Sequence, residues 1–296
     1  EINTNSFAYI LLFIILALGF ILRVHRIDQL LGFYFDQGRD ALVIWDFWHN
    51  GKVFLIGPTT GIEGIFRGPW YYWLILPFYI LGNGNPIFPS VFLSFTTILA
   101  SLLAFVIGRK VHSITAGILA AFISCFSFAL IISSRWLSNP TPMFLISMLL
   151  VYSLLLLSEG KKWIWIFIGF LLAMSMQFGS AAEVFYFPAV LIFGLTSKKY
   201  YPSFKIFILS ILAILFVFLP QIIFDLKHDG ILRVGLEKFL IKEESFKAPF
   251  LDVVKVRLPF YYDVFFGKIF HGFKETKILL SILIGTLTFI HLKEFL

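Results

Sequence analysis

The stretch Phe35-Asp36-Gln37-Gly38-Arg39-Asp40-Ala41 follows the first hydrophobic run of the chain and belongs to a polar segment that extends from Phe33 to Pro86. Acidic residues, arginines, glycines and aromatic residues gather in this segment, whereas most of the later sequence is apolar and is interrupted by short charged turns. A polar segment between two long apolar runs is expected to lie at a membrane surface, outside the hydrocarbon. The apolar runs on either side of it therefore decide the fold.

The composition of the chain predicts a membrane protein. Of its 296 residues, 59% are hydrophobic and 14% are charged, and the mean hydropathy is +0.91. A soluble core of this size cannot enclose so much apolar surface, so lipid must act as the solvent for most of it. The net charge of +7 does not indicate nucleic-acid binding, because most basic residues lie in short turns between the runs. The single cysteine, Cys125, excludes an intrachain disulfide and is expected to be a buried apolar residue.

Hydrophobic runs recur along the whole chain and predict an all-α polytopic membrane protein. Their length, roughly 15 to 22 residues, approaches what a helix needs to cross the hydrocarbon. Runs this long without polar alternation exclude barrel strands. We expect about eight spans, near residues 7–22, 87–108, 114–133, 142–158, 163–179, 182–196, 205–224 and 278–292. The fifth and sixth of these could also be one long run with a break.

Short charged turns predict the orientation of the spans. Arg109-Lys110, Lys161-Lys162 and Lys198-Lys199 occupy alternate connections, which the positive-inside rule assigns to the cytoplasm. The N-terminus is then cytoplasmic, and residues 23–86 and 225–276 form a first and a second extracytoplasmic segment. We expect the chain to be a fragment of a longer protein, since it begins at a glutamate and ends within or just after a hydrophobic run.

The first extracytoplasmic segment predicts two short surface helices. Residues 40–50 have helical periodicity and tryptophans suited to the membrane interface, and Gly51 is a plausible stop. After the loop 57–61, a second aromatic helix is expected from about Pro69 to Leu81. Both helices are expected to lie flat on the outer surface.

Carboxylates in the first segment are candidates for acid–base chemistry. Asp36 follows the first span, and Asp40 lies four residues further on, so both can share one side of a helix. Asp36 could act as a general base, or it could cap the surface helix, and the two roles are compatible. The sequence has no metal-ligand spacing. A divalent-metal site would have to be assembled in three dimensions, with Glu63 beside Asp36 or Asp40 as its best carboxylates.

Five cationic or ionisable side chains are candidates for binding a phosphate at the outer surface. Arginine binds phosphate in a bidentate manner, and lysine and histidine can add charge beside it. Pairing with nearby acids, contacts with lipid headgroups and snorkelling to the interface are the alternative explanations. The candidates are Arg39 and Arg67 in the first segment and Lys227, His228 and Arg233 in the second.

Together these residues resemble the GT-C membrane glycosyltransferases, in particular the protein-O-mannosyltransferase and aminoarabinose-transferase-like group of bacterial envelopes. Asp36-Gln37 stands where that group carries an acidic pair, and Arg67-Gly68-Pro69-Trp70-Tyr71-Tyr72 is similar to its second motif. Asp225-Leu226-Lys227-His228, after a proline-ended span, is also similar to that group. Gln37 replaces the second acid of the pair, so the role of an adjacent carboxylate is not carried over, and Asp40 could substitute for it.

The resemblance implies a transmembrane glycosyltransferase domain in the plasma membrane of a bacterium or archaeon. Its reaction would be inverting transfer of a hexosyl or pentosyl group from a polyprenyl-phosphate donor to a glycan, lipid or protein acceptor at the outer face. Asp36 would take the proton of the acceptor. The donor phosphate would be bound by some of Arg67, Lys227, His228, Arg233 and Arg39. The residues expected to line the substrate site are Asp40, Glu63, Trp70, Tyr71 and Tyr72, although membrane anchoring explains the three aromatic residues equally well.

Two alternatives of other kinds remain open from the sequence. One is a polyprenyl-linked polysaccharide polymerase or ligase, and the other is a non-enzymatic transporter of lipids or solutes. A transporter is expected to show repeated halves or paired broken helices with charges at mid-membrane. The sequence shows no such repeat, and its polar residues concentrate on one side of the predicted membrane. This asymmetry favours chemistry at the interface.

Overall fold

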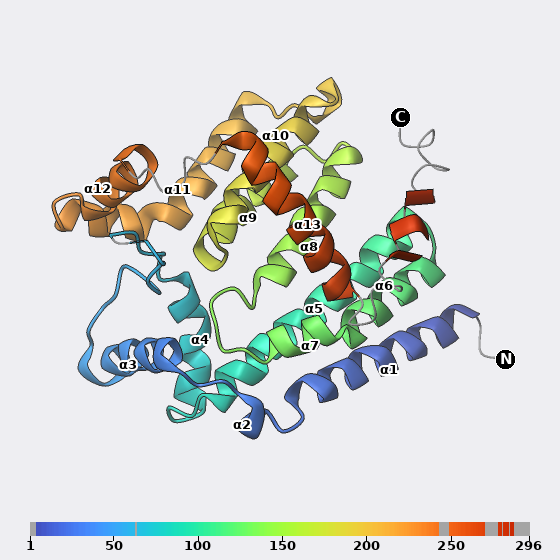
Figure 1. The fold of residues 1–296 in the computed structure, drawn as a ribbon, viewed down its shortest axis with the longest axis horizontal. Coiled ribbons are helices and arrows are strands. Elements are labelled where there is room, and N and C mark those ends of the chain that lie inside the picture. Colours follow the sequence, from blue (N-terminus) through green and yellow to red (C-terminus); the bar gives the residue numbers. More distant parts are fainter. Residues whose placement is uncertain are drawn as a thin grey trace.

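The computed structural model describes residues 4–62, 64–242, 249–269, 278–279, 281–283 and 285–286, and this part of the chain is an assembly of helices (Figure 1). Its only strand-like feature in the described ranges is an isolated bridge between Thr59 and Phe66. The helices are α1 (Thr4–Val24), α2 (Ile27–Leu30), α3 (Phe35–Asn50), α4 (Trp70–Leu81), α5 (Ile87–Val111), α6 (Ile114–Phe126), α7 (Phe128–Ser134), α8 (Met143–Ser158), α9 (Ile164–Phe178), α10 (Tyr186–Leu195), α11 (Phe204–Lys227), α12 (Ile231–Glu237) and α13 (Phe250–Ile269).

Three of these helices are long and apolar enough to cross a membrane, namely Ser6–Val24 within α1, all of α5 and all of α11. The bent pair α6–α7 makes a fourth if it is counted as one span. The helices α8, α9 and α10 are apolar but shorter. The chain is therefore an all-α membrane protein, and the count of about eight spans stays a prediction. Most of the last predicted run, 278–292, lies outside the described residues.

The predicted span 114–133 is broken at Ser127, where α6 and α7 meet at an angle of 58°. Because α6 ends there, the carbonyl groups of its last turn lose their helical N–H partners. Arg23, fully buried at the end of α1, donates to the carbonyl oxygens of Ser124 (3.0 Å) and Cys125 (2.8 Å). Arg135 in turn donates to the carbonyl oxygen of Arg23 (3.2 Å). Arg23 thus satisfies the end of α6, and Arg135, which follows α7, satisfies the end of α1.

The first polar segment forms both helices that the sequence predicts. Helix α3 begins at Phe35, earlier than residue 40, and it ends at Gly51, which adopts the left-handed conformation (φ 65°). It turns Phe35, Leu42 and Trp45 outward, while Ile44 is buried. This exposed apolar row suits an interfacial helix.

Helix α4 agrees with the predicted bounds but packs more deeply than a surface helix would. Tyr71, Ile75 and Tyr79 are buried in the main hydrophobic core, and α4 contacts both α5 and α9. The reason is its composition, because α4 contains no charged residue and offers apolar or aromatic side chains on every side.

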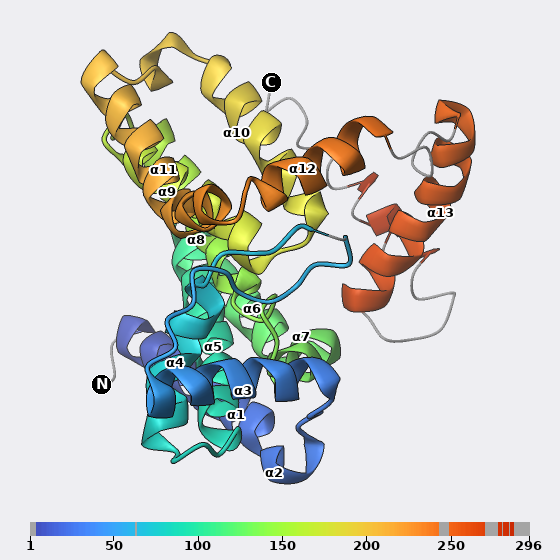
Figure 2. The ribbon, with the colours of Figure 1, turned by 90° about the vertical axis from the view of Figure 1, so that its left-hand side faces the viewer.

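The loop between α3 and α4 reaches from these helices toward α12 (Figure 2). At its base, the N–H of Gly57 donates to the carbonyl oxygen of Arg67 (2.8 Å). At its tip, Gly64 lies against Gly235 of α12, where a Cβ on Gly235 would come within 2.9 Å of the Gly64 backbone. The loop therefore joins the two segments that the sequence assigns to the same side of the membrane.

The base of this loop gives a stability prediction. A Cβ at position 57 would lie 2.1 Å from the carbonyl oxygen of Gly68, whereas one at Gly61 would meet nothing within 4 Å. We expect Gly57→Ala to lower the free energy of unfolding by about 2–4 kcal/mol, since rigid backbone must move. Gly61→Ala is the matched control and is expected to change it by less than about 0.5 kcal/mol. Thermal unfolding in detergent measures both, and equal melting temperatures would contradict the close approach.

Candidate functional site

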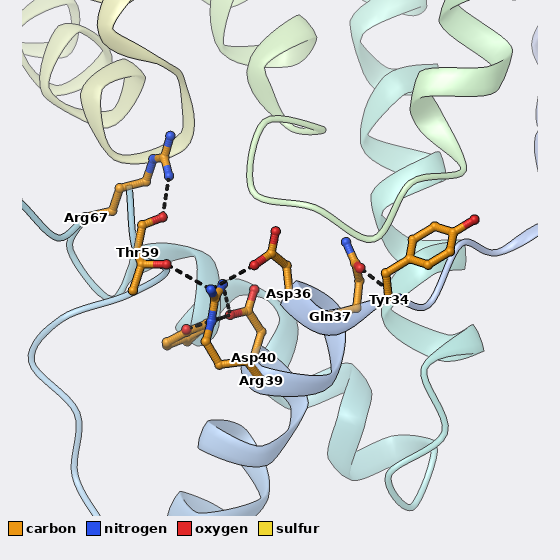
Figure 3. A network of polar contacts seen from close by, with 8 residues as sticks. Tyr34, Asp36, Gln37, Arg39, Asp40, Thr59 and Arg67 are labelled. Atoms are coloured by element: carbon orange, nitrogen blue, oxygen red, sulfur yellow. Dashed lines mark hydrogen bonds and ion pairs between the residues drawn. The ribbon is translucent and has the colours of Figure 1, made fainter. Parts of the chain in front are cut away.

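A network of charged side chains occupies the first two turns of α3 (Figure 3). Arg39 donates to Oδ1 of Asp36 (2.8 Å) and, through two nitrogens, to Oδ1 of Asp40 (2.8 and 3.0 Å). The Asp36 side chain is 69% exposed, whereas that of Asp40 is 9% exposed. One guanidinium therefore balances two carboxylates, and only the carboxylate of Asp36 is open to a ligand.

The start of α3 does not depend on Asp36. The N-cap residue is Tyr34, and its backbone N–H donates to the side-chain oxygen of Gln37 (3.0 Å). The N-cap role that the sequence left open for Asp36 is therefore taken by other residues. Gln37, which departs from the acidic pair of the GT-C group, helps to start the helix instead.

Asp40 connects α3 to α4. The Tyr72 hydroxyl donates to the same carboxylate oxygen that accepts from Arg39, at 2.8 Å. Burial raises the pKa of Asp40, and the hydrogen bonds from Arg39 and Tyr72 oppose that rise by stabilising the carboxylate. Because this oxygen already accepts several hydrogen bonds, Asp40 holds Arg39 in place.

Thr59 links this network to Arg67. Its hydroxyl accepts from Arg39 (2.8 Å), and its carbonyl oxygen accepts from Arg67 (3.3 Å). The Arg67 guanidinium also donates to the carbonyl oxygen of Gly179, at 2.8 and 3.1 Å, just beyond the end of α9. Figure 3 shows both arginines directed at Thr59 from opposite sides. Arg67 thus fastens the loop to α9.

A pocket of about 560 Å³ lies between this network and the end of α11. Its polar side chains come from both polar segments, with Arg39 and Thr59 on one wall and Lys227 and His228 on the other. The His228 ring stacks on Phe224, with 4.0 Å between ring centroids. The rest of its lining is largely apolar or aromatic, and includes Val43, Val53, Phe54, Leu55, Ile56, Phe66, Tyr72 and Phe224. The structure therefore brings together three of the five predicted cations.

The other predicted site residues lie elsewhere in the structure or outside the described residues. Arg67 does not line the pocket, but it donates to Thr59, which does. Arg233 belongs to α12 and lies near Gly230. The indole N–H of Trp70 donates to the carbonyl oxygen of Val217 (2.8 Å), and Tyr71 is buried in the core. Of the predicted aromatic lining residues, only Tyr72 borders this pocket. Glu63 lies outside the described residues.

Two glutamines that the sequence did not single out hold the Arg67 segment. Gln177 of α9 is buried and accepts from the N–H of Gly68. It donates to Gln221 of α11 (2.7 Å), which donates to the carbonyl oxygen of Phe66 (2.9 Å). Polar side chains within apolar runs are costly in lipid unless they are paired, and this was the signal available in the sequence.

Neither the search for metal ligands nor the comparison with known proteins assigns a function to this site. Within the described ranges, no three His, Cys, Asp or Glu side chains gather to form a metal site. No family model matches the chain, and no similar protein was found among curated proteins or solved structures. The fold and the site define the class as an all-α membrane protein with a basic pocket beside an exposed carboxylate.

Proposed function

We propose that this chain is an inverting glycosyltransferase of the GT-C type, which moves a sugar from a polyprenyl-phosphate donor to an acceptor at the extracytoplasmic membrane surface. The observation that carries the proposal is the pocket where Arg39 meets Lys227 and His228 beside the exposed carboxylate of Asp36. The residues come from two polar segments that are far apart in the sequence. Cations on one side of a reacting sugar and a base on the other are what such a transfer requires.

The phosphate of the donor would lie against the Lys227 wall of the pocket. The charge of Arg39 is already balanced by Asp36 and Asp40. Lys227 makes no ion pair within the part of the chain that the structure describes, so its ammonium can neutralise a phosphate oxygen. As the bond from the anomeric carbon to the phosphate oxygen breaks, the leaving phosphate gains charge, and a cation fixed nearby stabilises it.

The acceptor would lie on the Asp36 side. Oδ1 of Asp36 accepts from Arg39, and the second carboxylate oxygen can accept the proton of an acceptor hydroxyl or amine. The acceptor atom forms its bond to the anomeric carbon while the phosphate leaves from the opposite face, which inverts the configuration. The electron pair of the breaking bond goes to the phosphate, and the proton goes to Asp36.

Reconstitution tests the proposal directly. Proteoliposomes containing the chain would receive polyprenyl-phosphate donors that carry a radiolabelled hexose or pentose, together with glycan, lipid and peptide acceptors. We expect free polyprenyl phosphate to appear together with a labelled acceptor. Movement of intact donor across the bilayer without cleavage would favour the transporter instead, and a repeatedly extended lipid-linked glycan would favour the polymerase.

The pocket wall gives a second prediction. Lys227→Gln is expected to raise the apparent KM for the donor about tenfold or more, because a charge-assisted bond to the phosphate is lost. The matched control is Lys52→Gln, since Lys52 is exposed, pairs with Asp46 and does not line the pocket. Donor titrations on both variants measure the effect. An unchanged KM for Lys227→Gln would remove Lys227 from the donor site.

A further inference from the structure

A second cavity, of about 580 Å³, lies between α9, α10 and α11. Helices α9 and α11 pack along each other (Figure 1), and residues of α10 and of the connection 201–202 contribute the rest of the lining. The lining is almost entirely apolar and includes Ile168, Leu172, Leu191, Phe207, Ile211 and Ile214. A volume in this range accommodates a small-molecule ligand. This lining fits a hydrocarbon chain.

Trp165 fixes one end of the cavity. Its indole N–H donates to the carbonyl oxygen of Tyr200 (2.7 Å), which ties the start of α9 to the connection before α11. Its ring lies over Gly194 of α10, where a Cβ would approach it to 2.8 Å. The tryptophan is therefore both a wall of the cavity and a natural reporter of what occupies it.

Basic residues surround this same end. The starts of α9 and α11 and the end of α10 meet there, and each carries exposed lysines nearby. The acids between residues 159 and 205 are Glu159, which already pairs with Lys110 and Lys161, and Glu183, which lies beyond the opposite end of α9. The lysines of this cluster are Lys161, Lys162, Lys198, Lys199 and Lys205.

We infer that this cavity binds an acyl chain of an anionic phospholipid, whose phosphate headgroup contacts Lys198, Lys199 and Lys205. An apolar cavity in a membrane protein beside three lysines that make no ion pair with the described residues is complementary to this ligand in both polarity and charge. Helix α11 has 24 residues, so about 35 Å separates the lysine end from Lys227. The lipid site is therefore separate from the proposed catalytic pocket and does not depend on the proposed function.

Fluorescence quenching tests this site. The protein would be reconstituted in phosphatidylcholine vesicles that contain a small, increasing fraction of phosphatidylglycerol with brominated acyl chains, since bromine quenches tryptophans that it contacts. We expect half-maximal quenching of the Trp165 component at a mole fraction at least about tenfold lower than with brominated phosphatidylcholine, because the lysines attract the anionic headgroup. The Trp165 component is the difference between the wild type and Trp165→Phe.

Two charge variants complete the test. The triple variant Lys198→Gln/Lys199→Gln/Lys205→Gln is expected to lose the preference for the anionic lipid. The control Arg109→Gln, which removes a basic residue at the end of α5 and leaves Glu159 paired with Lys110 and Lys161, is expected to keep it. These lysines are exposed, so the triple variant is expected to fold, and its unquenched emission spectrum checks this. Equal quenching by the two lipids in the wild type, or a preference that survives in the triple variant, would overturn the inference.

Discussion

Replacing Asp36 by asparagine is expected to slow sugar transfer by about 10²- to 10⁴-fold, the range typical of losing a general base. Asparagine has nearly the same shape, and its amide oxygen can still accept from Arg39, so the network at the start of α3 should persist. The amide cannot take up the proton of an acceptor at neutral pH. The loss should therefore appear in kcat, measured with a saturating polyprenyl-phosphate sugar, with little change in the KM of the donor.

The same helix supplies the control for this variant. Asp46 also pairs with a cation, Lys52 at 3.0 Å, but Lys52 does not line the pocket, whereas the partner of Asp36, Arg39, does. Asp46→Asn is expected to retain near-normal activity. If a folded Asp36→Asn variant were as active as Asp46→Asn, Asp36 could not be the base. Asp40→Asn provides a contrast, because Asp40 is buried and is expected to act through the position of Arg39 and through stability.

The second large effect is expected at Arg23, where substitution by leucine should lower the free energy of unfolding by about 2–4 kcal/mol. Without the guanidinium, the carbonyl groups of Ser124 and Cys125 at the bend lose their donor. A buried carbonyl without a partner costs about 1–3 kcal/mol. Thermal unfolding in detergent, followed by loss of the monodisperse peak, measures the change.

Arg26→Leu is the control for Arg23→Leu. Arg26 lies three residues away, is exposed and donates to Gln29. Removing it should leave the melting temperature within a degree or two, since exposed polar contacts contribute little. Similar losses in the two variants would mean that the bend at Ser127 does not depend on Arg23.

The sequence predicts the long helices well but misses the break within one of them. Helices α1, α5 and α11 follow from runs of apolar residues, and glycine and proline mark the ends of α3 and α4. The run 114–133 is continuous in hydropathy, and a serine at position 127 is an ordinary residue in such a run. The donor that makes the bend possible, Arg23, is about 100 residues away along the chain, beyond the reach of any local pattern.

The sequence predicts that the charged residues of the candidate site lie on the same side of the membrane, but it does not predict the contacts that form the site. Counting spans places Arg39 and Lys227 on one side of the membrane, and the structure brings both to one pocket. Helical geometry explains why Tyr72 borders that pocket whereas Tyr71 does not, because neighbouring residues on a helix point about 100° apart. The glutamine pair that fixes the Arg67 segment depends on contacts between distant helices, which no local pattern reveals.

The two walls of the pocket differ in the conformational entropy that they would lose to a ligand. Arg39 is already held by four hydrogen bonds, to Asp36, to Thr59 and twice to Asp40, so an anion beside it would restrict few further rotamers. Lys227 has no ion-pair partner among the described residues and would have to become ordered at a cost of about 0.5–1.5 kcal/mol. The wall formed by α3 is preorganised, and the wall formed by α11 is adaptable.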